Sequence, residues 1–331
     1  MSAKQTPLAE KLAARIRREG PILFSEFMEA ALYDPEYGYY SAARRARREP
    51  TGIAGDYYTA TQLQPVFGRL MRAEAAEILE RLALPEGCTL ADWGAGRALM
   101  AEAFAGFRYI AVEAHTPLPA SFEGIVFANE LFDALPVDVV RGGRGGMRLQ
   151  RVAWKDGRFT WISAEEPEDR WKEYAGRLAR AFAELDEWEL ELPVRMEGVL
   201  DGIGASLARG AMLVIDYGYT EREIVRFPRG TLMSYRRHAA LEDVLAEPGA
   251  RDITAHVPFT HLAACAAAQG WKAAPLENLA SLLLRAGERD HFASALAAEG
   301  EEEAQRLRLQ LKTLLFGMGE TFRCLRLEKA G

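Results

Sequence analysis

The stretch TLADWGAGRALM, Thr89–Met100, decides the fold predicted for this chain. Thr89–Asp92 predicts a short buried strand, Gly94–Gly96 a tight turn, and Arg97 the start of a helix. Glycines let a backbone approach a ligand where a Cβ would clash, and the N–H groups at a helix start attract a carboxylate. The stretch therefore indicates an anion-binding turn, although a glycine turn that only joins a strand to a helix gives the same pattern.

Composition limits the class of protein. The chain has 331 residues, 49% of them hydrophobic, with a net charge of −7, which does not favour a nucleic-acid partner. No apolar run reaches ~18 residues, so we expect no membrane span. Three widely spaced cysteines without a CxxC pattern indicate a reducing compartment and no disulfide frame or zinc cluster. The N-terminus lacks a signal-peptide core, so we expect a cytoplasmic protein. We also expect no metal site.

Two further strands are predicted to bring polar residues to the same edge of a sheet. Tyr109–Val112 ends in Glu113, which is placed to accept hydrogen bonds from the ribose hydroxyls of a nucleoside cofactor. A solvated acid at a strand end is the alternative. Gly124–Ala128 runs into Asn129 and Glu130 at the carboxyl edge, where ligands bind in open α/β folds.

The rest of the chain predicts further elements around this sheet. Residues 148–161 alternate in period two around Asp156-Gly157, which predicts a hairpin in an inserted segment. We expect helices over 165–186 and 196–207 and a fifth parallel strand in the apolar run before Asp216. The predicted regions are an N-terminal helical and cofactor-covering part, a first core part, the insertion and a second core part, at 1–85, 86–145, 146–208 and 209–331.

Several sequence words occur in an order that resembles one family. They are GPILFSEFMEAALYDPEYGYY (20–40), GDYYTAT (55–61), WGAGRALM (93–100), NELFDALPV (129–137), IDYGY (215–219) and DITAHVPF (252–259). These words resemble the MidA family of class I S-adenosylmethionine (SAM)-dependent methyltransferases, which includes the mitochondrial arginine methyltransferase needed for complex I assembly. The resemblance implies an α/β fold: a Rossmann-like methyltransferase sheet with helices on both faces, an N-terminal helical region and an inserted hairpin and helical segment.

The resemblance implies SAM as the cofactor and assigns residues to it. Gly94 and Gly96 match the family's glycine turn, Glu113 its ribose-binding acid, and Asn129 the segment beside the transferable methyl. The implied cofactor residues are Gly55, Asp56, Thr59, Asp92, Gly94, Gly96, Glu113 and Asn129.

The resemblance also implies methylation of a protein, with arginine as the acceptor and a respiratory-complex subunit as the natural candidate. Glu130 and Asp133 are the expected pair that holds a guanidinium, since carboxylates bind this group in bidentate fashion. His256 is the expected proton relay. A structural histidine at 256 and a helix cap at Asp133 are the alternatives, and the oligomeric state is left open.

The sequence departs from the family plan in two places. The family's GPGRG turn appears as GAGRA over 94–98, with Ala98 in place of the last glycine. Only about ten residues separate Glu113 from the next strand, too few for the helix and strand that the plan puts there. An assembly factor with the fold but weakened or lost catalysis is therefore the alternative function. A nicotinamide-dependent oxidoreductase is disfavoured because Leu99 stands where GxGxxG needs glycine.

Overall fold

The computed structural model describes residues 6–41, 64–114, 116–117, 119–236, 239–241 and 243–331. They form two compact units, each assembled from separate stretches of the chain. The first unit draws on 1–58, 133–196 and 219–256, and the second on 59–132, 197–218 and 257–331. The two units alternate along the sequence, so neither unit is one continuous segment of the chain. The four consecutive regions expected from the sequence remain a prediction.

The second unit is built on one mixed sheet. β2 (Thr89–Trp93) pairs in parallel with β3 (Arg108–Val112) and with β4 (Phe122–Asn129), and β4 pairs in parallel with β9 (Leu207–Tyr219). The strand order is β14-β16-β9-β4-β2-β3, with β13 on β9 and β15 on β16. The outer strands are β13 (Val257–Pro258), β14 (Lys272–Ala273), β15 (Glu277–Asn278) and β16 (Phe322–Lys329), the last antiparallel to β9. This order confirms the predicted Rossmann-like α/β fold.

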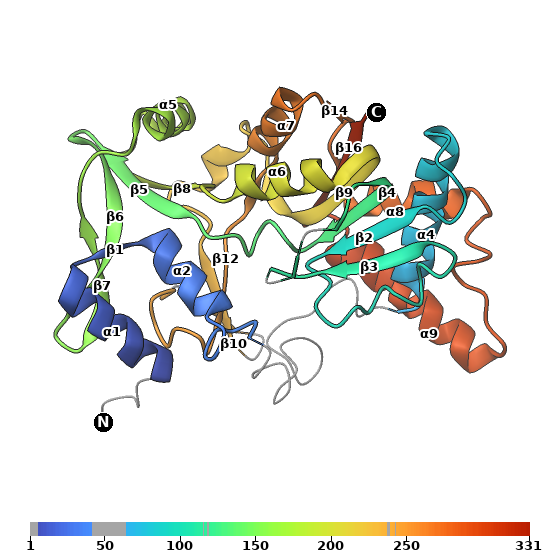
Figure 1. The fold of residues 1–331 in the computed structure, drawn as a ribbon, viewed down its shortest axis with the longest axis horizontal. Coiled ribbons are helices and arrows are strands. Elements are labelled where there is room, and N and C mark those ends of the chain that lie inside the picture. The colour runs from blue at the N-terminus through green and yellow to red at the C-terminus, as the bar shows by residue number, and fades with distance from the viewer. Residues whose placement is uncertain (1–5, 42–63, 115, 118, 237–238, 242) are drawn as a thin grey trace. The chain divides into compact units, whose positions relative to one another are not determined.

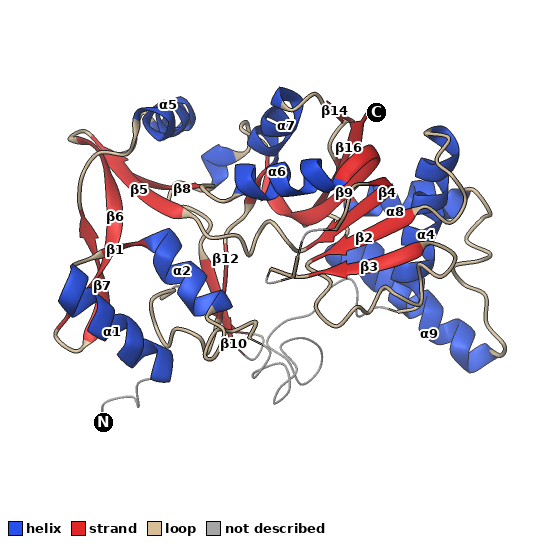
Figure 2. Cartoon of the chain, in the orientation of Figure 1, coloured by secondary structure: helices blue, strands red, loops and turns tan. Residues whose placement is uncertain are grey.

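Helices pack on both faces of this sheet, as Figures 1 and 2 show. Successive strand residues point to opposite faces, so Leu90, Ile125 and Phe127 enter one core cluster with the helices α4, α8 and α9. Their bounds are α4 Val66–Arg81, α8 Leu279–Glu288 and α9 Glu301–Lys312, the last continued by a π-helical turn at Thr313–Met318. On the other face lie α6 (Met196–Ser206) and α7 (Phe259–Ala268).

Two glycines allow the amino ends of three parallel strands to approach closely. A Cβ at Gly124 would lie 1.9 Å from the Thr89 carbonyl oxygen, and one at Gly210 would lie 1.8 Å from the Gly124 carbonyl oxygen. Any other residue would push β2, β4 and β9 apart at this level. These contacts help to fix which residues emerge together at the opposite, carboxyl edge of the sheet.

The first unit holds a second, antiparallel sheet. Its order is β1-β6-β5-β8, with β7 on β6, and a separate three-stranded sheet has the order β11-β10-β12. The strands are β1 (Ile22–Leu23), β5 (Asp138–Gly143), β6 (Gly146–Lys155), β7 (Arg158–Ser163), β8 (Glu187–Leu192), β10 (Met233–Arg236), β11 (Ala239–Leu241) and β12 (Asp252–Thr254). Its helices are α1 (Pro7–Glu19), α2 (Phe24–Tyr33) and α5 (Asp169–Leu178), with short 3-10 turns at Ala179–Phe182 and Ile224–Arg226.

The predicted hairpin forms, and the predicted helix after it is shorter than expected. Asp156 and Gly157 have φ angles of 50° and 77°, which is the backbone of a tight two-residue hairpin turn between β6 and β7. The helix predicted over 165–186 is limited to α5 and its 3-10 continuation. The chain then enters β8, where Trp188, Leu190 and Leu192 are buried on alternate positions.

A buried carboxylate ties the helices of the second unit to the sheet. Glu74 on α4 has no exposed surface, and its two oxygens accept from Arg285 Nη1 at 2.6 Å and from Arg326 Nη1 at 3.2 Å. Arg285 belongs to α8 and Arg326 to β16. Removing one partner from such a group leaves uncompensated charge, which costs more than the intact pair contributes.

We expect Glu74→Ala to lower the free energy of unfolding by about 3 kcal/mol, since the largely buried Arg326 would keep Glu328 but lose its fully buried carboxylate partner. Urea denaturation measures this loss. The control is Glu77→Ala, which removes a partly exposed partner of Arg285 but leaves Glu74 in place, and it should cost less than about 1 kcal/mol. Equal losses in the two variants would contradict the prediction.

Candidate cofactor site at the strand ends

The carboxyl ends of three neighbouring strands bring the predicted cofactor residues of the second unit together. Trp93 at the end of β2 is in register with Val112 of β3 and Ala128 of β4. The residues that follow, Gly94, Glu113 and Asn129, therefore leave the sheet at the same level. We call Gly94, Gly96, Glu113, Asn129 and Glu130 the strand-end site.

The turn after β2 is held by backbone contacts and open to solvent. Gly94 has φ +78° and donates its N–H to the Val112 carbonyl at 2.8 Å, which locks the turn to the end of β3. A Cβ at Gly94 would approach Leu131 Cδ1 to 3.1 Å, so a larger residue would disturb the loop after β4. At Gly96 (φ +56°) an added Cβ would meet nothing closer than 4.0 Å.

The helix predicted from Arg97 is wrong. Residues 96–104 form a series of turns, closed by contacts such as Ala98 N–H to Ala95 O at 2.8 Å and Ala101 N–H to Ala98 O at 3.0 Å. Ala98 has φ +53°, in the left-handed region, where an α-helix cannot continue. The turn therefore presents single backbone N–H groups, not the N-terminus of a helix.

Glu113 lies against the glycine turn. Its carboxylate accepts a hydrogen bond from the Gly96 N–H, and its own N–H donates to Thr116 Oγ1 at 2.9 Å. The two parts of the sequence that were predicted to hold opposite ends of one cofactor are thus in direct contact.

Asp92 is buried beneath this turn and bonded to a residue that the sequence analysis missed. The Tyr109 hydroxyl donates to Asp92 Oδ2 at 2.6 Å, joining β2 to β3. Burial, opposed in part by this hydrogen bond, and the nearby Glu113 charge raise the pKa of Asp92 to about 6. Burial and the Asp92 carboxylate in turn raise the pKa of Tyr109. As one aromatic residue within a predicted apolar strand, Tyr109 gave no signal of this pairing.

The loop after β4 begins with a strained residue. Glu130 has φ +52°, unusual for a residue with a side chain, and its N–H donates to the Ile215 carbonyl at 2.9 Å. Asn129 Nδ2 donates to Glu130 Oε1 at 3.0 Å, whereas the buried Asn129 Oδ1 has no hydrogen-bond partner among the described residues. A strained backbone beside an unsatisfied buried acceptor is typical of functional sites.

Asp216 at the end of β9 holds the same loop in place. It is fully buried, and its Oδ2 accepts from the Phe132 N–H at 2.8 Å. Its Oδ1 accepts from the N–H of Tyr217 at 2.9 Å. The sequence analysis placed Asp216 only at a strand end. Its contact with position 132, 84 residues away, could not be read from spacing.

Asp133 and His256 belong to the first unit. Asp133 is buried, and its carbonyl accepts from the Ala255 N–H at 2.9 Å, so the residue before His256 lies beside it. The His256 N–H donates to Thr231 Oγ1 at 2.9 Å, its ring lies edge-on to Phe227, and burial lowers its pKa. Residues 131–137 contain no helix, so Asp133 does not cap one and that alternative is wrong.

Three of the predicted cofactor residues, Gly55, Asp56 and Thr59, lie outside the described residues.

The connection after Glu113 has no helix or strand in its described residues, 114, 116–117 and 119–121. Together with β3 it encloses a cavity of about 180 Å³, lined by residues that include Ile110, Pro117 and Phe122. Ligand pockets are commonly 300–1,000 Å³, so this cavity is too small to replace the missing part of a nucleoside pocket. The sheet consequently ends at β3 in the part of the chain that the structure describes.

Comparison with known proteins identifies what this architecture is similar to. Residues 106–276, more than half of the chain, match a family model described as "Putative S-adenosyl-L-methionine-dependent methyltransferase". A crystal structure from Burkholderia thailandensis bound to S-adenosyl-homocysteine aligns with TM-score 0.81 and 28% identity, over 97% of this chain and 92% of that one. A second, native structure from this organism gives TM-score 0.79 and 26% identity, over 97% and 91%.

Curated relatives carry an activity in their names. "Protein arginine methyltransferase NDUFAF7 homolog, mitochondrial" of Drosophila melanogaster is 24% identical over 76% of this chain and 68% of its own length. "Protein arginine methyltransferase NDUFAF7, mitochondrial" of Xenopus laevis is 24% identical over 77% of this chain and 68% of its own length.

The predicted cytoplasmic location is contradicted by these names, because both relatives are named as mitochondrial proteins. No helix in the described residues is both long and apolar enough to cross a bilayer.

We expect Asp92→Asn to change how stability depends on pH. A raised pKa of about 6 means that Asp92 favours the folded state when protonated and loses this contribution as pH rises through about 6. Wild type should therefore lose up to about 3 kcal/mol relative to Asp92→Asn between about pH 4 and pH 7. Urea denaturation across this range measures the difference, and a pH-independent difference would contradict it.

Tyr109→Phe is the companion variant. It removes the hydroxyl that stabilises the Asp92 carboxylate, so the pKa of Asp92 should rise above about 6. Carbon-13 NMR titration of the Asp92 carboxyl measures this pKa directly. An unchanged or lower value would show that the hydrogen bond does not control the titration.

Proposed function

Because this chain belongs to the S-adenosyl-L-methionine-dependent methyltransferase family, we propose that it methylates arginine side chains of a protein substrate. The family supplies the activity and the cofactor, SAM, and it confirms the resemblance predicted from the sequence words. The arginine acceptor is supported by the names of the curated relatives. The observation in this chain that most directly supports the proposal is Glu130, a carboxylate residue with a strained backbone at the strand ends.

The strand-end site fits the cofactor on two structural observations. The turn at Gly94 and Gly96 is exposed, with space beside Gly96 that a side chain would occupy, and the buried Asn129 Oδ1 has no partner among the described residues. We assign the backbone N–H of Gly96 to the methionine carboxylate of SAM and Glu113 to its ribose. Gly94, whose N–H is bonded to the Val112 carbonyl, is assigned to shaping the turn beside the cofactor. Asp92 supports the turn from below. Gly55, Asp56 and Thr59 complete the assignment from the family resemblance alone.

SAM supplies an electrophilic methyl group on a positively charged sulfur, so the protein has mainly to align the acceptor and exclude water. We assign Glu130 to the guanidinium, where its carboxylate would accept N–H hydrogen bonds so that one nitrogen faces the methyl. Asp133 is assigned to the guanidinium from the family resemblance alone. A guanidinium keeps its proton before transfer, so a carboxylate orients it first and accepts a proton late in the reaction.

His256 is assigned as the group that receives this proton. Burial lowers its pKa, so the imidazole is neutral at pH 7, while the same burial disfavours the imidazolium that a relay would form. The competing role is structural: its backbone N–H bonds Thr231 and its ring packs against Phe227. His256→Gln distinguishes the two, because a relay role lowers turnover without changing stability, whereas a structural role lowers stability.

A respiratory-complex subunit is the first candidate for the protein substrate, on the family resemblance. The alternative function, an assembly factor without catalysis, is favoured by one specific observation. The Glu113 carboxylate is bonded to the Gly96 N–H, the contact that both groups would give up to hold SAM.

We expect isothermal titration calorimetry to show micromolar SAM binding that Gly94→Val and Glu113→Ala each weaken at least tenfold. Gly94→Val places a branched side chain against Leu131, and Glu113→Ala removes the ribose acceptor. The matched control is Glu123→Gln, which changes an exposed glutamate at the amino end of β4. Absence of binding at millimolar SAM would favour the assembly-factor function.

Glu130→Gln separates binding from chemistry. It should leave SAM affinity within about threefold of wild type and lower kcat about 10²–10⁴-fold, because the amide neither balances the guanidinium charge nor accepts its proton. Radiolabelled SAM and a lysate of the source organism provide the assay, with mass spectrometry to locate methylarginine in labelled bands. Unchanged turnover would remove Glu130 from the mechanism, and label on residues other than arginine would overturn the proposed acceptor.

A further inference from the structure

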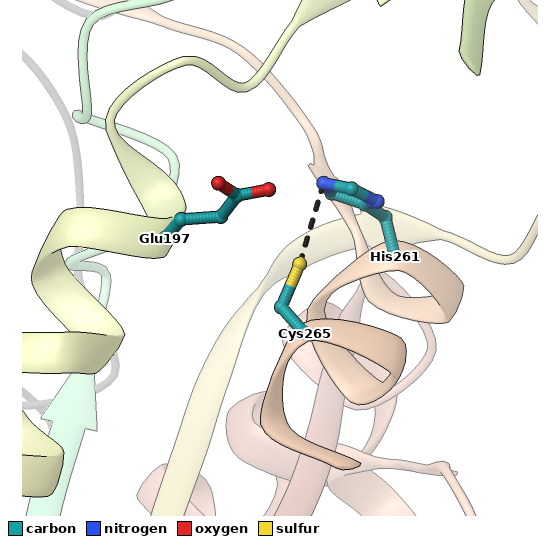
Figure 3. Close-up of side chains that lie close together, drawn as sticks. All are labelled: Glu197, His261 and Cys265. Atoms are coloured by element: carbon teal, nitrogen blue, oxygen red, sulfur yellow. Dashed lines mark hydrogen bonds between the residues drawn. The ribbon is translucent and has the colours of Figure 1, made fainter. Parts of the chain in front are cut away.

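Three potential metal ligands lie together in the second unit. Glu197 is in the first turn of α6, and His261 and Cys265 are one turn apart on α7. Their ligand atoms all lie within 4.8 Å of one another. Figure 3 shows the carboxylate of Glu197 pointing from one helix toward the imidazole and thiol of the other. The strand-end site does not include any of these residues.

The spacing of the donor atoms fits a tetrahedral metal ion. Cys265 Sγ and His261 Nε2 are 3.4 Å apart. With Zn–S of about 2.3 Å and Zn–N of about 2.0–2.1 Å, tetrahedral geometry places a sulfur and a nitrogen ligand about 3.6 Å apart. Two ligands therefore already have nearly the separation that zinc requires. The Glu197 carboxylate, the third ligand, has an oxygen within 4.8 Å of both other ligand atoms.

The kind of donors selects the kind of metal. A thiolate, an imidazole and a carboxylate together suit zinc, whereas magnesium and calcium are bound through oxygen. All three side chains are half-buried, so an ion can enter from solvent.

A hydrogen bond between Cys265 and His261, which are four residues apart on one helix, is the simplest alternative. It accounts for that pair but not for a carboxylate that arrives from a different helix. The two helices are also joined nearby, since Gln269 Nε2 donates to Asp201 Oδ1 at 2.8 Å. This contact joins the middle of α6 to the C-terminal end of α7.

We propose that Glu197, His261 and Cys265 bind a zinc ion, with water as the fourth ligand. The ion would connect α6 to α7 and stabilise the second unit by binding the folded state only. The proposal does not depend on the methyltransferase activity, because none of the three residues is assigned to the cofactor or to the acceptor.

The test uses the full chain, stripped with a chelator, and zinc chloride as the ligand. Calorimetry should show one zinc per chain, and cobalt should give the near-ultraviolet absorption of a thiolate ligand. Cys265→Ser, His261→Ala and Glu197→Gln should each lower zinc affinity at least about tenfold. His291→Asn, which changes an exposed histidine elsewhere in the unit, is the control and should bind zinc as wild type does. Zinc binding that is absent, or equal in all variants, would overturn the proposal.

A measurement on wild type alone guards against variants that fold poorly. Zinc should protect Cys265 from iodoacetamide, as followed by peptide mass spectrometry, while the buried Cys88 and Cys324 provide the internal comparison. Zinc should also raise the Tm of wild type, with reversal by chelator. Alkylation of Cys265 at the same rate with and without zinc would overturn the assignment of this thiol as a ligand.

Discussion

The close approach of β2, β4 and β9 is the constraint on which the strand-end site depends. Gly124 and Gly210 leave no room for a Cβ against the neighbouring carbonyls, so the three strands meet tightly at their amino ends. From there the parallel register carries Trp93 and Ala128 to the same level at the other edge. The positions of the turn, the acid and the amide thus follow from contacts made about five residues earlier along each strand.

Elements with a strong local pattern could be predicted from the sequence. β2, the hairpin at Asp156-Gly157 and α6 have an apolar run, a turn dipeptide and a helical period, and all three form where expected. β5 was missed because its short apolar run ends in two glycines. β8 was missed although Trp188, Leu190 and Leu192 alternate with glutamates, because no element was predicted between the helices expected over 165–186 and 196–207.

The sequence predicts that Glu113 and Asn129 follow strands that end at one edge of the sheet, but it does not predict the contacts made there. Glu113 and Asn129 were found because parallel strands end at one edge of a sheet. Strand-end spacing does not say that Glu113 reaches the Gly96 N–H or that Asp216 reaches the Phe132 N–H, since side-chain directions across a sheet depend on the assembled fold. Ala98 has a left-handed backbone, and turns form there instead of the predicted helix. The residue type alanine does not predict this conformation.

The shortened connection after Glu113 leaves β3 with one pairing partner, β2, in the described part of the sheet. A strand with a free side exposes backbone groups that can recruit the same strand of another molecule into a growing aggregate. Pro117 and Pro119 line a cavity beside β3, and proline cannot donate to a ladder of hydrogen bonds. The side of β3 that has no partner among the described strands is therefore bordered by a connection that cannot donate ladder hydrogen bonds at these two positions.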